Sequence, residues 1–175
     1  MQLIKTLFFS FLLIGVVVPV LATPPFQILR TCMDNKPYNN KIKLTRLDGD
    51  GLADKPLEGC QEQYERSING HMYGTTTCDD KFYLLINDKK YDPVLAENYS
   101  INPEIKPGIE FSKETWWQVD SENQAYLCIY AALSDSGIGA AYNQYYIIEN
   151  PFEINSKLYY YFFDKNVVPI GSKTL

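Results

Sequence analysis

The sequence has few of the residues and motifs on which common enzyme sites depend. It contains one histidine, His71, no Cys-x-x-Cys pair and no Gly-x-Ser-x-Gly motif. The familiar zinc sets and the α/β-hydrolase nucleophile elbow are therefore excluded, and any Ser–His or Cys–His mechanism would have to use His71. Gly137-Ile138-Gly139 is too short for a phosphate loop and no lysine follows at the required spacing, so we interpret it as a hairpin turn. These absences favour a binding protein over an enzyme.

The spacing of apolar residues also gives no sign of long helices. No amphipathic stretch longer than about three turns has the spacing of a surface helix, and short β-prone segments alternate with Gly, Pro, Asn and Asp breaks. Tyr126 to Leu133 is apolar at successive positions, so a strand there must be covered on both faces. We predict a single mainly β domain over residues 23–175, an antiparallel sandwich or barrel with two disulfides.

The hairpin signal at Asn69-Gly70 is the sharpest in the chain. Asn-Gly supplies the positive φ angles of a type I′ turn, which would pair Ile68 with His71 and leave His71 as an exposed residue at a strand end. The alternative is that Gln63–Arg66 ends a short helix. The predicted strands are Phe26–Thr31, Lys41–Arg46, Gln63–Ile68, His71–Thr76, Lys81–Ile86, Tyr91–Leu95, Ile109–Val119, Gln124–Leu133, Ile138–Glu149, Lys157–Phe163 and Asn166–Ile170.

The N-terminus has the features of a secretory signal peptide. Lys5 precedes an apolar run from Leu7 to Val18, and small residues follow up to Ala22. The competing interpretation is an uncleaved anchor, but the run is short for a span of about 20 residues. We expect cleavage after Ala22 and a secreted or periplasmic product without a membrane span. The triplet Asn98-Tyr99-Ser100 is an N-glycosylation sequon in a predicted loop, relevant only in a eukaryotic source.

Four cysteines remain after the signal peptide: Cys32, Cys60, Cys78 and Cys128. An even number in an exported chain indicates two disulfides, with three possible connectivities that the sequence does not separate. Our prediction is Cys32–Cys60 together with Cys78–Cys128. The second bond would close a loop of about 50 residues and stabilise the fold by about 4 kcal/mol.

The chain is acidic. Its formal net charge is −5, and removing residues 1–22, whose only charged residue is Lys5, makes it one unit more negative. Binding to a phosphate backbone needs clustered Lys and Arg. The densest basic patch is sparse and is better explained as a solvated strand face: Lys36, Lys41, Lys43 and Arg46. Nucleic acid is therefore not an expected partner.

Calcium is the one cofactor that the sequence suggests. The stretch Leu47–Asp54 is rich in Asp and Gly and resembles the calcium loops of dockerin-like, thrombospondin-type and FG-GAP repeats. Aligned on Gly51, its acids occupy the third, fifth and ninth loop positions: Asp48, Asp50 and Asp54. Arg46 stands at the first ligand position, and Leu57 stands where a closing acid is expected, with Glu58 one residue late. The alternative is an Asp/Gly turn between strands.

An aromatic cluster is the predicted recognition surface. Trp116 and Trp117 are adjacent, so in a strand their side chains point to opposite faces, one toward the core and one toward the surface. An exposed tryptophan beside tyrosines from neighbouring strands would stack on a sugar ring or anchor a protein partner. The tyrosines are Tyr126, Tyr130 and Tyr145. The alternative is that one tryptophan packs in the core and a loop covers the other.

Carboxylates near the two tryptophans allow a second hypothesis. A glycosidase needs two acids about 5 to 10 Å apart in a cleft. The candidates are Glu110, Glu114, Asp120 and Glu122. The leading prediction is an exported, non-enzymatic binding protein of the inhibitor, immunity or effector type that recognises a protein or glycan. The alternatives are a carbohydrate-active hydrolase using these acids and a calcium-stabilised structural module.

Overall fold

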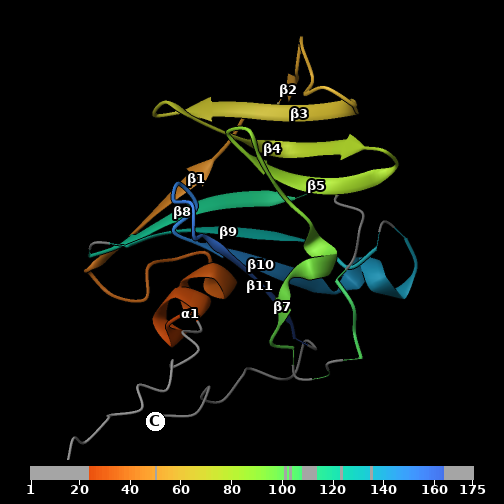
Figure 1. Cartoon of the computed structure of the whole chain (residues 1–175). Helices are drawn as coiled ribbons and strands as arrows, with labels where there is room; N and C mark the ends of the chain where they lie inside the picture. Colours follow the sequence, from red (N-terminus) through yellow and green to blue (C-terminus); the bar gives the residue numbers. More distant parts are fainter. Residues whose placement is uncertain are drawn as a thin grey trace, which may run out of the picture.

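The fold has three layers: two β-sheets and one helix (Figure 1). The computed structural model describes residues 24–163 except Asp50, Ile101, Pro103, residues 108–113, Asn123, Asp135 and the side chain of Ala141. The predicted signal peptide and the predicted strand Asn166–Ile170 lie outside the described residues. Within the described ranges, no helix has the length and apolar character needed to cross a membrane.

Sheet A is the six-stranded sheet at the centre of the fold, with strand order β1-β8-β9-β10-β11-β7. Its strands are β1 (Ile42–Leu47), β7 (Glu97–Asn98), β8 (Thr115–Ser121), β9 (Gln124–Ala132), β10 (Asn143–Glu149) and β11 (Lys157–Phe162). The pairs are antiparallel, except that β7 runs parallel to β11.

Sheet B has five strands in the order β2-β3-β4-β5-β6. They are β2 (Gly51–Leu52), β3 (Cys60–Ile68), β4 (His71–Cys78), β5 (Lys81–Ile86) and β6 (Lys89–Tyr91). The predicted β3–β4 hairpin is confirmed, because Ile68 pairs with His71 around Asn69 and Gly70, both at positive φ. The predicted mainly β fold with two disulfides is also confirmed, and the two sheets remain separate rather than closing into a barrel.

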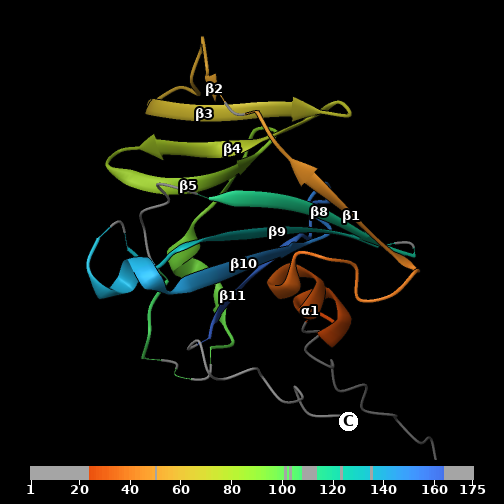
Figure 2. The ribbon, with the colours of Figure 1, turned by 180° about the vertical axis from the view of Figure 1, so that it is seen from behind.

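Sheet A is covered on both faces. Its inner face packs on sheet B through one apolar cluster that includes Trp116, Leu127 and Ile129 of sheet A with Tyr73 and Leu84 of sheet B. Its outer face packs on the helix α1 (Phe26–Asp34), which lies below sheet A in Figure 1 and in the reverse view of Figure 2. This double cover explains why the β9 segment is apolar at successive positions.

The predicted strand Phe26–Thr31 is wrong, because this segment forms α1. Ile28, Leu29 and Cys32 fall on one face at helical spacing and are buried against sheet A. The helix ends at Asp34, and the next residue, Asn35, adopts the left-handed conformation of a C-terminal cap. Nine residues are too few to give a periodic signal that outweighs the β-propensity of Phe, Ile and Thr.

Several predicted strand ends are also wrong. The turn after β5 has only two residues, Asn87-Asp88, so the return strand β6 begins at Lys89 and ends at Tyr91. Residues 93–95 then form a 3₁₀ turn that begins at a proline. Residues 138–141 form a second 3₁₀ turn, and β10 begins only at Asn143. Two segments outside the predicted strands contain the short strands β2 and β7. Of the predicted strand Ile109–Val119, residues 109–113 lie outside the described residues.

The predicted disulfide pairing is wrong. The bonds are Cys32–Cys128 and Cys60–Cys78. Cys60 and Cys78 lie directly opposite each other in the β3–β4 ladder, whereas Cys32 faces the centre of sheet A from α1. The pairing therefore follows the sheet register and the helix cover, and neither depends on the order of the cysteines along the chain.

The turn that joins β10 to β11 is anchored to sheet B. Lys89 Nζ donates hydrogen bonds to the carbonyl oxygens of Glu153, at 3.5 Å, and Ile154, at 3.0 Å, and to the hydroxyl of Ser156. Tyr91 Oη lies 2.6 Å from the same hydroxyl and 3.3 Å from the carbonyl oxygen of Pro151. A charged donor with several acceptors holds this turn in one position.

Candidate functional site

Four of the five aromatic residues predicted for recognition lie on the outer face of sheet A. Strand alternation and the cross-strand register place four of the side chains on the same face as Cys128, which is the face that packs on α1: Trp117, Tyr126, Tyr130 and Tyr145. Trp116 points the other way and is completely buried between the sheets. The prediction that one tryptophan would lie in the core and the other nearer the surface agrees with this arrangement.

Three of these side chains form a half-buried group that we call the aromatic surface: Trp117, Tyr130 and Tyr145. Tyr130 and Tyr145 are register partners whose ring centroids lie 6.0 Å apart. Tyr126 is not part of it, because the start of α1 covers its ring and leaves it 1% exposed. Burial, above all other causes, raises the pKa of Tyr145, and the carboxylate of Asp34 at the end of α1 adds to this effect.

Two ion pairs lie on elements that border the aromatic surface, one at the end of β1 and one at the end of α1. Arg46 Nε lies 2.7 Å from Asp48 Oδ1, and the Arg46 guanidinium lies 5.9 Å from the centre of the Trp117 ring. At the end of α1, Arg30 Nη2 donates to Asp34 Oδ2 at 2.8 Å. The arrangement is an aromatic patch with a charged rim of both signs.

The predicted calcium loop is only partly described. Asp50 lies outside the described residues, Asp48 pairs with Arg46, and Gly51-Leu52 joins sheet B as β2. In the part of the chain that the structure describes, no group of three His, Cys, Asp or Glu is placed to hold a metal ion. Calcium binding by Asp48, Asp50 and Asp54 therefore stays a prediction.

The carboxylates proposed for a glycosidase do not come together in one described cleft. Glu110 lies outside the described residues. Glu114 precedes β8 and Asp120 lies near the other end of that strand, so the two residues are separated by about 20 Å of extended chain. Asp120 accepts a hydrogen bond from Gln118 at 2.8 Å, whereas Glu122 lies in the β8–β9 turn and pairs with Lys41. A separation of about 20 Å is too large for a catalytic pair.

His71 stands at the start of β4, as predicted, but its ring is half-buried. It stacks on Phe152 of the β10–β11 turn with ring centroids 3.8 Å apart. The contact joins sheet B to the anchored turn, so the geometry gives His71 a packing role.

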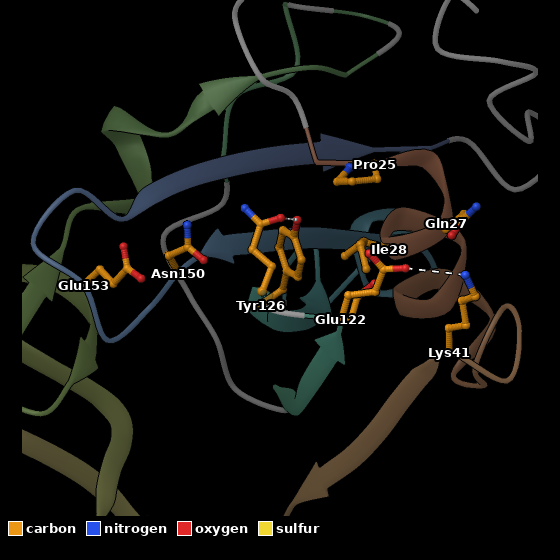
Figure 3. A pocket seen from close by; sticks show the side chains of 10 residues that line it. Pro25, Gln27, Ile28, Lys41, Glu122, Tyr126, Asn150 and Glu153 are labelled. Carbon is orange, nitrogen blue, oxygen red and sulfur yellow. Dashed lines mark hydrogen bonds and ion pairs between the residues drawn. The ribbon is translucent and has the colours of Figure 1, made fainter.

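A polar cleft lies at the end of sheet A where β8 turns into β9 (Figure 3). Tyr130 and Tyr145 pair toward the other end of β9. The volume of the cleft is about 560 Å³, and it is formed by the start of α1, the residue before β1, the β8–β9 turn and the β10–β11 turn. The lining residues are Pro25, Gln27, Ile28, Lys41, Ser121, Glu122, Gln124, Tyr126, Asn150 and Glu153. Figure 3 shows Tyr126 in the middle, with Asn150 and Glu153 on one side and Glu122 and Lys41 on the other.

A hydrogen-bonded chain fixes one wall of the polar cleft. Tyr126 donates to Gln124 Oε1 at 2.6 Å, Gln124 Nε2 donates to Glu149 Oε1 at 2.9 Å, and Tyr159 donates to Glu149 Oε2 at 2.8 Å. Burial, with a smaller contribution from the Glu149 charge, raises the pKa of Tyr126 to about 12. The phenol therefore stays protonated near neutral pH and remains a hydrogen-bond donor.

Sequence reasoning did not find the polar cleft, although it selected Tyr126 and Glu122 for other roles. The lining comes from several segments that are far apart in the chain and carry no shared motif. The Asn150-Pro151 break marks the turn that forms one wall, but nothing in the sequence brings that turn next to residues 25–28.

The fold and these two surfaces define a class of protein: a disulfide-linked two-sheet β fold whose larger sheet is covered by a short helix. Comparison with protein-family models, curated proteins and solved structures finds no match to the chain.

Proposed function

We propose that this chain is an exported, non-enzymatic binding protein that recognises a protein partner outside the cytoplasm through the aromatic surface. The observation that carries the proposal is the half-buried group Trp117, Tyr130 and Tyr145, whose side chains stay partly exposed on the outer face of sheet A beside α1. Tryptophan, tyrosine and arginine are the residues that most often dominate the energy of protein interfaces.

Export is supported by the signal-like N-terminus together with the two disulfides, which persist in oxidising compartments. The acidic net charge is compatible with a soluble product that does not bind nucleic acid.

At this surface a protein partner is favoured over a glycan. The Arg46 guanidinium lies over the Trp117 ring, so that ring face is not open for stacking on a sugar. The ion pairs Arg46–Asp48 and Arg30–Asp34 supply the polar rim that surrounds the apolar centre of a protein interface.

The test is affinity capture of extracellular proteins from the native source on immobilised mature protein, followed by binding measurements with each purified candidate. Trp117→Ala and Tyr145→Ala are compared with Tyr64→Ala, a matched control on sheet B whose side chain is 45% exposed. A partner is expected to bind wild type and the control equally and to bind the Trp117 variant about 30-fold more weakly, as at an interface hot spot. Equal retention by all four proteins would contradict the proposal.

A further inference from the structure

We propose that the polar cleft binds a neutral sugar ring. This site is separate from the aromatic surface, and the proposal does not depend on the protein partner suggested above. The cleft volume of about 560 Å³ lies within the range of about 300 to 1,000 Å³ that small-molecule sites occupy.

The hydrogen-bonding groups of the polar cleft match the hydroxyls of a sugar. The carboxamide of Asn150 offers a donor and an acceptor, and the hydroxyl of Ser121 offers both. Gln27 contributes its amide N–H groups, because its Oε1 already accepts from Asn39 Nδ2 at 3.3 Å. Glu122 and Glu153 add acceptors at opposite sides (Figure 3). Sugar hydroxyls also donate and accept, so a lining of this mixed kind can satisfy a ring of them, whereas it would leave an apolar ligand with unpaired polar neighbours.

The charges of the lining exclude an anionic ligand class. Among the described residues that line the cleft, Lys41 is the only cationic one, and its Nζ lies 3.6 Å from Glu122 Oε1. Because the charge of Lys41 offsets that of Glu122, the remaining carboxylate of Glu153 gives the lining a net negative charge. This charge disfavours the binding of phosphates, sulfates and acidic sugars.

The walls are held in place before any ligand arrives. The backbone N–H of Asn150 donates to the carbonyl oxygen of Ala125 at 2.9 Å, and that of Glu153 donates to the carbonyl oxygen of Asn150 at 2.9 Å. Lys89 holds the same turn from sheet B, and Tyr126 orients Gln124. A preformed wall reduces the ordering cost of binding.

The experiment uses the whole mature protein and ligand-observed NMR, with a panel of methyl glycosides of glucose, galactose, mannose, fucose and N-acetylglucosamine. Methyl glucuronide and spermidine are included as anionic and cationic probes. We expect one or more neutral glycosides to bind. Amide shifts of the ¹⁵N-labelled wild type should then change at Gln124, Asn150 and Glu153, a result that needs no variant.

Two variants then test the contacts. Asn150 has a positive φ of 48°, so Asn150→Gly removes the carboxamide without backbone strain, and Asn69→Gly, at φ 54° in the β3–β4 turn, is its matched control. We expect about tenfold weaker glycoside binding for Asn150→Gly and no change for Asn69→Gly. Glu153→Gln retains an oxygen acceptor and should keep glycoside binding within about threefold, because the ligand is neutral.

The proposal is overturned if no neutral glycoside binds, or if the shifts of a bound glycoside fall outside the cleft. Binding of spermidine alone, abolished by Glu153→Gln, would assign the cleft to an amine instead and would equally overturn it. None of these results bears on capture of a protein by the Trp117 surface, so the two proposals fail independently.

Discussion

Cys32 and Cys128 join the covering helix to the central strand of sheet A, with their Cα atoms 5.7 Å apart. Both residues are almost completely buried, and they belong to the cluster that fills the space between α1 and the sheet. The bond therefore ties a segment near the N-terminus to the middle of the fold, and it fixes the helix that borders both the aromatic surface and the polar cleft.

We predict that the two disulfides contribute unequally to stability. Cys32–Cys128 spans 96 residues and Cys60–Cys78 spans 18, so loop-closure entropy makes the first worth about 1.5 kcal/mol more. Paired Cys→Ala variants of each bond should show this difference in urea unfolding. Non-reducing peptide mapping should recover the two linked peptides, and a Cys32–Cys60 peptide would contradict the fold.

The two tryptophans are expected to respond in opposite ways to substitution. Trp116→Ala should lower the free energy of unfolding by about 3 to 5 kcal/mol, because it empties a fully buried site between the sheets. Trp117→Ala should cost about 1 kcal/mol, because the side chain is only half-buried. Acrylamide quenching provides a second readout, since the tryptophan left in Trp116→Phe should be quenched more strongly than the one left in Trp117→Phe. Equal costs and equal quenching would show that both side chains lie in the same environment.

Stability should fall at alkaline pH. Burial, with help from Asp120, raises the pKa of Tyr73 to about 12, and burial with help from Glu149 does the same for Tyr126. A phenol in the unfolded chain titrates near pH 10, so this contribution is complete below about pH 10 and is lost as the pH rises from there toward 12. Urea midpoints measured from pH 8 to 11.5 should stay level and then decline.

The matched variant for this prediction is Tyr126→Phe, which removes one of the titrating groups. Its urea midpoint should decline less steeply above pH 10 than that of wild type, even though its stability at pH 8 is reduced by the lost bond to Gln124. A decline of unchanged steepness would assign the alkaline loss to other groups.

Lys89→Met should loosen the turn that forms one wall of the polar cleft. The variant keeps the length of the side chain but removes the charged donor to the Glu153 and Ile154 carbonyls, at a cost of about 1.5 kcal/mol. Hydrogen exchange at the Glu153 and Ser156 amides should become faster. Lys90→Met, on the neighbouring residue of β6, is the control and should change neither quantity appreciably. Unchanged exchange in the Lys89 variant would mean that other contacts hold the turn.

Much of the strand pattern was readable because each signal is local. The Asn69-Gly70 turn, the alternation in β1 and the aromatic run of β11 depend on neighbouring residues alone. The register of the hairpin comes within one residue of the Cys60–Cys78 pairing. Continuing it from Ile68–His71 brings Cys60 opposite Asp79, and the irregularity between Cys60 and Glu62 moves the partner to Cys78.

The candidate sites were predicted only in part, because local signals do not determine which distant segments meet. The opposite orientation of Trp116 and Trp117 follows from strand geometry, which any strand at that position must obey. The position of α1 determines that Tyr126 is covered while Tyr145 stays half-buried. The sequence could not give this position, because the α1 segment was predicted as a strand. The polar cleft needs four separate segments brought together, which no local pattern encodes.

The amino-acid sequence alone determined that the chain is mainly β, that its cysteines pair, that the β9 strand is covered on both faces, and that common metal, nucleophile and phosphate motifs are absent. Those properties follow from composition and from periodicity over a few residues. Only the tertiary structure decided which element covers sheet A, which cysteines meet, and which aromatic and polar side chains share a surface. These outcomes depend on contacts between residues distant in the chain, whose energies are set by packing and burial rather than by local propensity.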